Sequence, residues 1–143
     1  MVRGKTEREE GDGGEMSKLT RDEIMARWDA STSRERDAWV AKKVMGLTMS
    51  ELSMNSYPKV VNPNNEAYIM AVDYYSTEIS AAMEIVEKLK HTEGFKYFCV
   101  SMMEGGKLTV GFILGEKTSG TEPMLSLSEG ICKAALLVME GKG

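Results

Sequence analysis

The stretch Ser76–Leu114 constrains the fold more than any other part of the chain. Its first part, Ser76–Lys90, carries apolar residues at helical spacing, which predicts an amphipathic helix. The apolar stripe of this predicted helix consists of Ile79, Ala82, Met83, Val86 and Leu89. We expect Ser76 and Thr77 to cap the start of the helix and Gly94 to end it.

Two runs with the composition of β-strands follow this helix, at Phe95–Met102 and Lys107–Leu114. The short Gly-rich segment between them predicts a hairpin. The second run alternates apolar and polar residues, whereas the first carries apolar residues on both faces. Because strands that are apolar on both faces are usually covered on both sides, we expect other elements to pack on each face of this hairpin.

Shorter elements are predicted on either side of this helix and hairpin. Capping boxes at Thr20–Glu23 and Ser126–Glu129 each predict the start of a helix, and a further helix covers Arg34–Met45. Short strands are predicted at Lys59–Val61 and Tyr68–Val72. The resulting order, α-α-(β)-α-β-β-α, predicts an α+β fold in which an antiparallel β-sheet is layered with helices as an α-β-α sandwich.

The chain of 143 residues is long enough for one domain with a substantial core. Residues 1–15 are charged and Gly-rich, and this composition predicts a disordered tail. A second interpretation is that Gly13–Met16 is encoded as GGA-GGT-GAG-ATG, a bacterial ribosome-binding site that runs into a start codon. Residues 1–15 would then be a non-native extension. Both interpretations place a single domain at 16–143.

The composition argues against several classes of protein. The net charge of −4 argues against general nucleic-acid binding, which requires a basic surface. No apolar run approaches the roughly 20 residues of a membrane helix, so we expect no membrane association. Cys99 and Cys132 lie within a predicted strand and a predicted helix, which favours buried thiols in a reducing cytoplasm. One histidine and two distant cysteines do not make a usual zinc site, so we expect neither metal nor cofactor.

No group of residues predicts catalysis. The only histidine, His91, lies at the end of a predicted helix, and no serine or cysteine nucleophile motif accompanies it. Gly105 and Gly106 belong to the predicted hairpin turn and lack the surroundings of a phosphate-binding loop. We therefore expect a protein that is not an enzyme and has no catalytic residues.

A ligand site is predicted where two aromatic rings precede the helix that is expected to begin at Ser76. The free N–H groups at a helix N-terminus bind phosphate or carboxylate, and aromatic rings stack on bases. The predicted ligand-binding residues are Tyr57, Lys59, Asn62, Asn64, Tyr74, Tyr75, Ser76 and Thr77. This combination suits a small nucleotide-like ligand, and the alternative is that the same residues only cap the helix and pack the loop.

Four segments together resemble the ABA-sandwich domain family of small phage and prophage proteins. They are Leu19–Met25, Arg34–Gly46, Tyr75–Leu89 and Glu129–Leu136. The resemblance spans roughly residues 18–140, and it favours Met16 as the start because such proteins begin close to the first of these segments. The chain departs from the family pattern at Leu47 and Met83, where tryptophan is common.

The resemblance implies α-β-α layers but no activity, so it identifies no catalytic residues. By analogy with small phage proteins of similar architecture, it implies a non-enzymatic accessory protein in the cytoplasm of the bacterial host. Such a protein binds and sequesters a nucleotide-derived signalling molecule as a homo-oligomer and so counters host defence. The alternative is a protein-binding module that inhibits a host defence enzyme or has a role in phage assembly.

A chain that begins at Met16 should unfold at the same temperature as the full chain, because residues 1–15 carry no apolar periodicity with which to pack. Thermal unfolding followed by circular dichroism measures this. A loss of several degrees in the shorter chain would show that these residues contribute to the fold.

Overall fold

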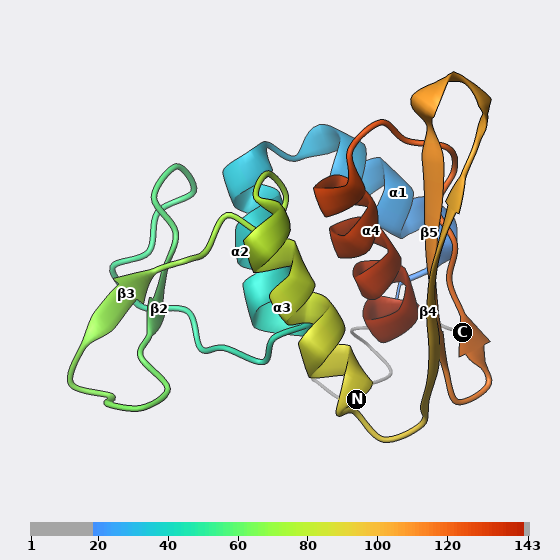
Figure 1. Ribbon diagram of the computed structural model, residues 1–143. Helices are drawn as coiled ribbons and strands as arrows, with labels where there is room; N and C mark the ends of the chain where they lie inside the picture. The colour runs from blue at the N-terminus through green and yellow to red at the C-terminus, as the bar shows by residue number, and fades with distance from the viewer. Residues whose placement is uncertain (1–18, 142–143) are drawn as a thin grey trace, which may run out of the picture.

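The structure, a computed structural model, describes residues 19–141 (Figure 1). The predictions for residues 1–15 and for the start at Met16 lie outside the described residues. The four helices of the described part are α1 (Arg21–Ala30), α2 (Ser33–Lys43), α3 (Ile79–Lys90) and α4 (Leu127–Glu140).

The strands of the described part form two antiparallel sheets. The smaller sheet pairs β2 (Lys59–Val61) with β3 (Ile69–Ala71). The larger has the order β4-β5-β6 and consists of β4 (Phe95–Met102), β5 (Leu108–Leu114) and β6 (Lys117–Thr118). These elements confirm the predicted α+β class and the predicted order, to which the structure adds the short β6.

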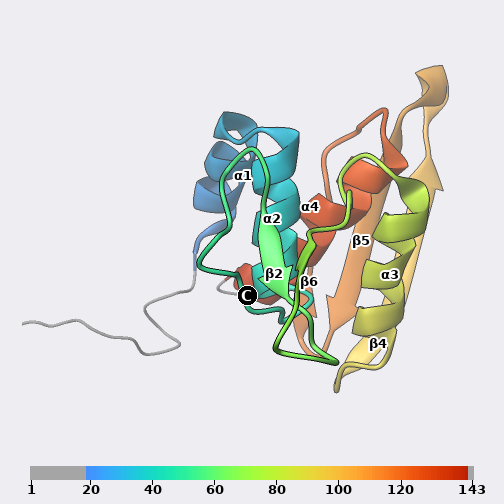
Figure 2. The same cartoon turned by 90° about the vertical axis from the view of Figure 1, so that its left-hand side faces the viewer.

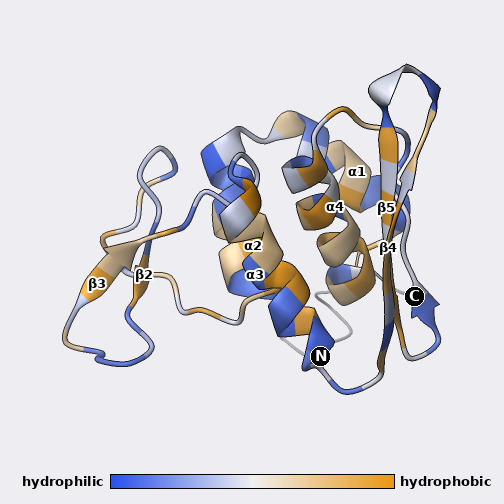
Figure 3. Ribbon diagram, in the orientation of Figure 1, coloured by the Kyte–Doolittle hydropathy of each residue, from blue (hydrophilic) through white to orange (hydrophobic). Residues whose placement is uncertain are grey.

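Helix α4 lies at the centre of the molecule, between α3, the pair α1 and α2, and strand β5 (Figures 1 and 2). The structure buries this helix on nearly every side. Its buried residues are Ser128, Gly130, Ile131, Cys132, Lys133, Ala134, Ala135, Leu136, Leu137, Val138 and Glu140. Figure 3 shows apolar residues along most of the length of α4. The core therefore forms around α4 rather than around α3.

Two glycines allow the layers to approach closely. A side chain at Gly130 in α4 would place its Cβ 2.7 Å from Cγ2 of Val110 in β5. A side chain at Gly111 would place its Cβ 2.6 Å from the backbone oxygen of Ser119. Both distances are shorter than real Cβ contacts allow. The glycine at 130 therefore allows α4 to pack closely on β5, and the glycine at 111 allows the chain after β6 to do the same.

The larger sheet has helices on one face, and Figure 1 shows it nearly edge-on with α2, α3 and α4 on the same side. The expectation that both faces of β4 are covered is therefore wrong: Tyr97 is 63% exposed and Met102 is 75% exposed. The physical reason is that β4 is the outer strand and, of the described helices, α3 makes the main contact with it. Cys99, which was expected to be buried, is exposed on this strand, whereas Cys132 is buried.

Helix α3 begins three residues later than the sequence predicts. Ser76 and Thr77 do not cap it; Glu78 occupies the N-cap position and makes no side-chain capping hydrogen bond. The backbone N–H of Ser76 donates instead to Oδ1 of Asp37 at 2.7 Å, which holds Ser76 in the core. The helix ends at Lys90 rather than at Gly94, which adopts a positive φ in the turn before β4.

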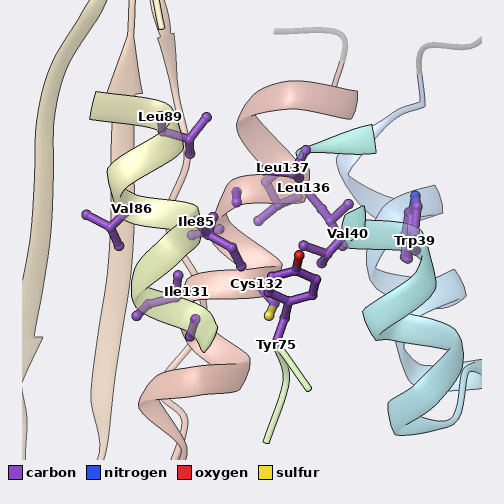
Figure 4. Close-up of a cluster of buried hydrophobic side chains, with 14 of the residues drawn as sticks. Trp39, Val40, Tyr75, Ile85, Val86, Leu89, Ile131, Cys132, Leu136 and Leu137 are labelled. Atoms are coloured by element: carbon purple, nitrogen blue, oxygen red, sulfur yellow. The ribbon is translucent and has the colours of Figure 1, made fainter. Parts of the chain in front are cut away.

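The buried face of α3 is also rotated from the predicted stripe. Ala82, Val86 and Leu89 are buried as predicted, but Ile79 and Met83 are 46% and 43% exposed. Ala81 and Ile85 are buried in their place. This rotation arises because α3 packs against α4 and Tyr75, toward which Ile85 points in Figure 4, as well as against β4.

The predicted helix starts at the two ends of the chain are confirmed. Thr20 and Glu23 form a complete capping box at α1, and Thr32 and Glu35 form another at α2. The side chain of Ser126 accepts a hydrogen bond from the backbone N–H of Glu129 at α4. These local motifs hold because each needs only residues three positions apart.

Replacing Gly111 with alanine should lower the free energy of unfolding by about 1–3 kcal/mol, the usual cost of overpacking. The new Cβ would meet a backbone oxygen, which cannot rotate away as a side chain can. The control is Gly120→Ala, since nothing lies within 4 Å of a Cβ at that position. Urea denaturation of both variants measures the difference, and equal stabilities would contradict the packing described here.

Candidate functional site

The segment from Val72 to Ser76, which contains three predicted site residues, is held against α2 by hydrogen bonds to Arg34 and Asp37. Asp37 is fully buried and accepts hydrogen bonds from Nη1 of Arg34 and from the backbone N–H of Ser76, each at 2.7 Å. Arg34 also donates to the backbone oxygens of Val72 at 2.7 Å and Asp73 at 3.2 Å. These contacts position the chain between β3 and α3.

This network leaves little of the predicted stacking surface open. Tyr75 is 2% exposed, and Figure 4 shows its ring among the core side chains of α2, α3 and α4. Desolvation by burial, with the nearby carboxylate of Asp73, raises the pKa of Tyr75 above its usual range. The guanidinium of Arg34 lies 3.9 Å from the ring centroid of Tyr74 and covers one face of that ring. Ser76 is buried, and Thr77 is exposed before the helix.

The other four predicted residues lie around the β2–β3 hairpin. Tyr57 and Asn64 are exposed, while Lys59 and Asn62 are half-buried. The side-chain oxygen of Asn62 accepts a hydrogen bond from the backbone N–H of Asn64 at 2.8 Å, which shapes the turn. Asn62 also lines a cavity of about 300 Å³ between residues 46–48 and 61–66. The structure therefore does not bring the eight predicted residues together into one site.

A larger cleft, of about 700 Å³, lies between α1, α2, the loop that follows α2 and the end of α4. Its lining contains basic, acidic and apolar side chains. The lining includes Arg27 of α1, Glu35, Trp39, Lys42 and Lys43 of α2, Met49 and Met54 of the loop, and Glu140 of α4.

An aromatic and basic wall forms one side of this cleft. The guanidinium of Arg27 lies 4.0 Å from the ring centroid of Trp39, a cation–π arrangement that fixes the guanidinium plane. Trp39 is itself 3% exposed and donates from Nε1 to Oε1 of Glu140 at 3.1 Å. Arg27 is exposed, so a bound molecule would meet the guanidinium rather than the indole.

The cleft lining has three cationic side chains, Arg27, Lys42 and Lys43, and two carboxylates, Glu35 and Glu140. The carboxylate of Glu35 accepts the backbone N–H of Thr32 at 2.8 Å in the capping box, and Glu140 is occupied by Trp39. Within residues 19–141, Lys42 and Lys43 form no salt bridge. Because the cations Arg27, Lys42 and Lys43 outnumber these two carboxylates, the lining favours an anionic ligand.

These residues can hold and orient an anionic molecule, but they do not present a pair of groups for acid–base chemistry. The only histidine, His91, lies outside the cleft at the end of α3, where Nε2 is 3.6 Å from Oε1 of Glu87. In the described part of the chain, no three His, Cys, Asp or Glu side chains are grouped so that they could hold a metal ion.

Sequence reasoning missed this cleft although part of its pattern is local. Trp39, Lys42 and Lys43 stand at positions i, i+3 and i+4 of one helix, which places them on one face. A search for aromatic and basic residues at helical spacing would have found them. Arg27 and Glu140 lie far away in the sequence, and no local pattern connects them with Trp39.

The chain forms a small α+β domain with a cleft large enough for a small molecule. Comparison with known protein families identifies the family to which it belongs. The sequence model of the phage ABA sandwich domain matches residues 38–136, so the chain belongs to this phage protein family. This confirms the family predicted from the sequence. Trp39, Lys42 and Lys43 lie within the matched residues, and Arg27 precedes them.

One solved structure shows the same fold. It is the crystal structure of a phage protein from Bacillus cereus ATCC 14579, with a TM-score of 0.56 and 20% sequence identity. The match covers 73% of this chain and 89% of that chain. The chain has no match among the curated proteins. None of the helices within residues 19–141 has the length and apolar character that crossing a membrane requires.

Replacing Asp37 with alanine should lower the free energy of unfolding by about 3–5 kcal/mol, because it leaves Arg34 and the N–H of Ser76 without their buried partner. The matched control is Asp29→Ala on the exposed side of α1, which should change stability by less than about 0.5 kcal/mol. Urea denaturation measures both, and a mild effect at Asp37 would show that the segment does not depend on this contact.

Proposed function

We propose that this member of the phage ABA sandwich domain family is a non-enzymatic accessory protein that binds a small anionic, nucleotide-like molecule in the cleft beside Trp39. The observation that carries the proposal is the group of cations, Arg27, Lys42 and Lys43, that lines the cleft without carboxylate partners in the described part of the chain. Unpaired cations around one hollow favour a ligand that brings negative charge.

The dimensions and chemistry of the cleft support this class of ligand. Its volume of about 700 Å³ lies in the range of small-molecule pockets. The lysines match phosphate oxygens as point charges, and the guanidinium of Arg27, supported by Trp39, offers a flat surface on which a base can stack. Met49 and Met54 add flexible apolar contacts at the edge.

Sequestration fits the cleft better than conversion of the ligand. The carboxylates that line it, Glu35 and Glu140, already accept hydrogen bonds from the protein itself. A protein of this kind would act in the cytoplasm of the infected bacterium, where it lowers the free concentration of a nucleotide-derived signal and so counters host defence. No cofactor is needed for such a role.

A second candidate function is supported by a surface that adjoins the cleft at Met54. The β2–β3 hairpin and the loop before it project from the helices at the left of Figure 1. Their exposed large apolar residues are Leu52, Met54, Tyr57, Tyr68, Ile69 and Met70. Exposed apolar patches often mark protein-binding surfaces, so this arm supports the alternative of a module that binds a host defence enzyme or a phage assembly partner.

Isothermal titration calorimetry with ADP-ribose and with a cyclic dinucleotide tests the cleft. The double substitution Lys42→Ala, Lys43→Ala should raise the Kd of the ligand that binds by about a hundredfold or more, since each lost charge-assisted hydrogen bond is worth about 1.5–3 kcal/mol. The control is Lys88→Ala, an exposed lysine on α3 outside the cleft, which should leave the Kd unchanged.

The same experiment separates the candidate functions. Ligand released from the heated protein should be chromatographically identical to the ligand supplied, and a converted product would make the protein an enzyme. Equal Kd values for the wild type and the double variant would exclude the cleft as the site. Absence of binding to both nucleotide classes would favour the protein-binding function of the β2–β3 arm.

A further inference from the structure

The outer edge of β4 presents unpaired backbone groups. β4 is the end strand of its sheet, and within residues 19–141 no strand pairs with its outer side. The backbone N–H of Met103 donates to the oxygen of Lys107 at 2.7 Å, so the odd-numbered residues of β4 direct their backbone groups toward β5. The alternation of an antiparallel ladder then leaves those of Phe98, Val100 and Met102 pointing outward. Long open edges of this kind are rarely left uncovered in proteins.

Apolar side chains accompany this open edge on both faces of the sheet. Tyr97 and Met102 are among the most exposed large apolar side chains of the described chain. On the helix-covered side, Ile79 and Met83 of α3 are also exposed. Met83 precedes Val86 by about one turn and Ile79 by about two turns on the same flank of α3, and Figure 4 shows Val86 pointing toward the strands. The open edge is therefore continuous with an apolar flank of α3.

The regularly paired part of β4 is centred on Val100 and has one charged residue just beyond each end. A bulge at Lys96 interrupts the pairing with β5 at one end, and the turn that begins at Glu104 ends it at the other. The stretch between them, Tyr97–Met103, is centred on Val100. Lys96 and Glu104 carry opposite charges, are both exposed, and make no salt bridge within residues 19–141.

We propose that a second copy of this chain pairs with β4 in antiparallel fashion about a twofold axis at Val100. The two three-stranded sheets then form one continuous six-stranded sheet. Val100 lies opposite Val100 of the second copy, and Phe98 lies opposite Met102 of the second copy. Lys96 of each chain faces Glu104 of the other, so the dimer contains two equivalent ion pairs. This pairing uses one surface twice, as twofold dimers require.

The charges of Lys96 and Glu104 favour this pairing register over the adjacent registers. A register that keeps each side chain on its face must differ by an even shift. The adjacent choices place Lys96 opposite Met102 or Gly106 of the second copy, and neither forms the ion pairs. In the proposed register the two α3 helices lie on the same face of the joined sheet, and the exposed Ile79 and Met83 of each chain lie toward the twofold axis.

The dimer interface and the ligand cleft lie on different sides of the molecule. The cleft lies beside α1 and α2, and Figure 2 shows α4 between these helices and β5. The proposed dimer therefore rests on none of the evidence for the ligand, and each proposal is tested without the other.

Sedimentation equilibrium of the full chain tests the dimer, with a wild-type mass expected at twice the 15.8 kDa of one chain. Lys96→Glu and Glu104→Lys each place two like-charge pairs at the interface, so each should raise the dimer Kd by about tenfold or more. The combined substitution Lys96→Glu, Glu104→Lys restores opposite charges and should return the Kd to within about threefold of the wild type. Lys88→Glu is the control for a change of net charge and should have no effect.

Two further variants test the strand pairing itself. Val100→Pro removes an outward N–H without breaking the β5 ladder, so it should give a folded monomer. Ser101→Cys should form a covalent dimer under oxidation, because it places a thiol opposite Cys99 of the second copy at about 4.5 Å between Cα atoms, within disulfide range. The wild type should not cross-link.

Each alternative result would overturn the proposal. A monomeric wild type would exclude the dimer, and charge variants that dimerise like the wild type would exclude this edge. A combined variant as weak as the single ones would exclude the ion pairs. A folded Val100→Pro dimer would place the interface elsewhere, and wild-type cross-linking through Cys99 would contradict the register centred on Val100.

Discussion

The burial of α4 on nearly every side is the constraint on which the rest of the structure depends. A helix in this position must contact α1, α2, α3 and β5 at once, and its small residues allow these elements to approach. Gly130 lies directly against Val110 of β5. Where α4 carries polar groups, the structure provides partners: Lys133 donates to Glu122 at 2.6 Å, and Glu140 accepts from Trp39. Buried polar groups need such partners because leaving them unpaired in the core is costly.

Helix α2 connects this core to the candidate site. At 100° per residue, Asp37 lies on the opposite side of the helix from Lys42 and Lys43, with Trp39 on the cleft side. Asp37 accepts a hydrogen bond from Ser76 in the segment that leads into α3. Trp39 contacts Arg27 of α1 through its ring and donates a hydrogen bond to Glu140 at the end of α4. The cleft therefore has rigid helical walls, and its basic side chains project from elements that the core already holds in place.

Local sequence patterns predicted much of the fold and little of the site. The helix starts at Thr20 and Ser126 and the limits of β4 depend on neighbouring residues, and the sequence identifies them. The start of α3 was misplaced because Asp37, 39 positions earlier, takes the N–H of Ser76. The same long-range contact places Tyr75 in the core rather than at a stacking surface. The cleft joins α1, α2 and α4, so only the tertiary structure reveals which charges face one another.

The expectation that both faces of β4 are covered also failed because a local pattern does not show which segments pack on a strand. Its apolar residues on both faces predicted coverage that the single chain does not provide, and pairing with a second copy would extend the sheet at that edge. In both cases the local pattern identifies the element but not its surroundings, which depend on residues far away in the sequence.

The most direct test of the central claim is an NMR titration of the ¹⁵N-labelled full chain with ADP-ribose and, separately, with a cyclic dinucleotide. We expect the largest changes in backbone chemical shift on α1, α2 and the loop at residues 49–58, around Arg27, Trp39, Lys42 and Lys43. Changes confined to residues 59–77 or to β4, or no saturable changes with either molecule, would contradict the proposed site.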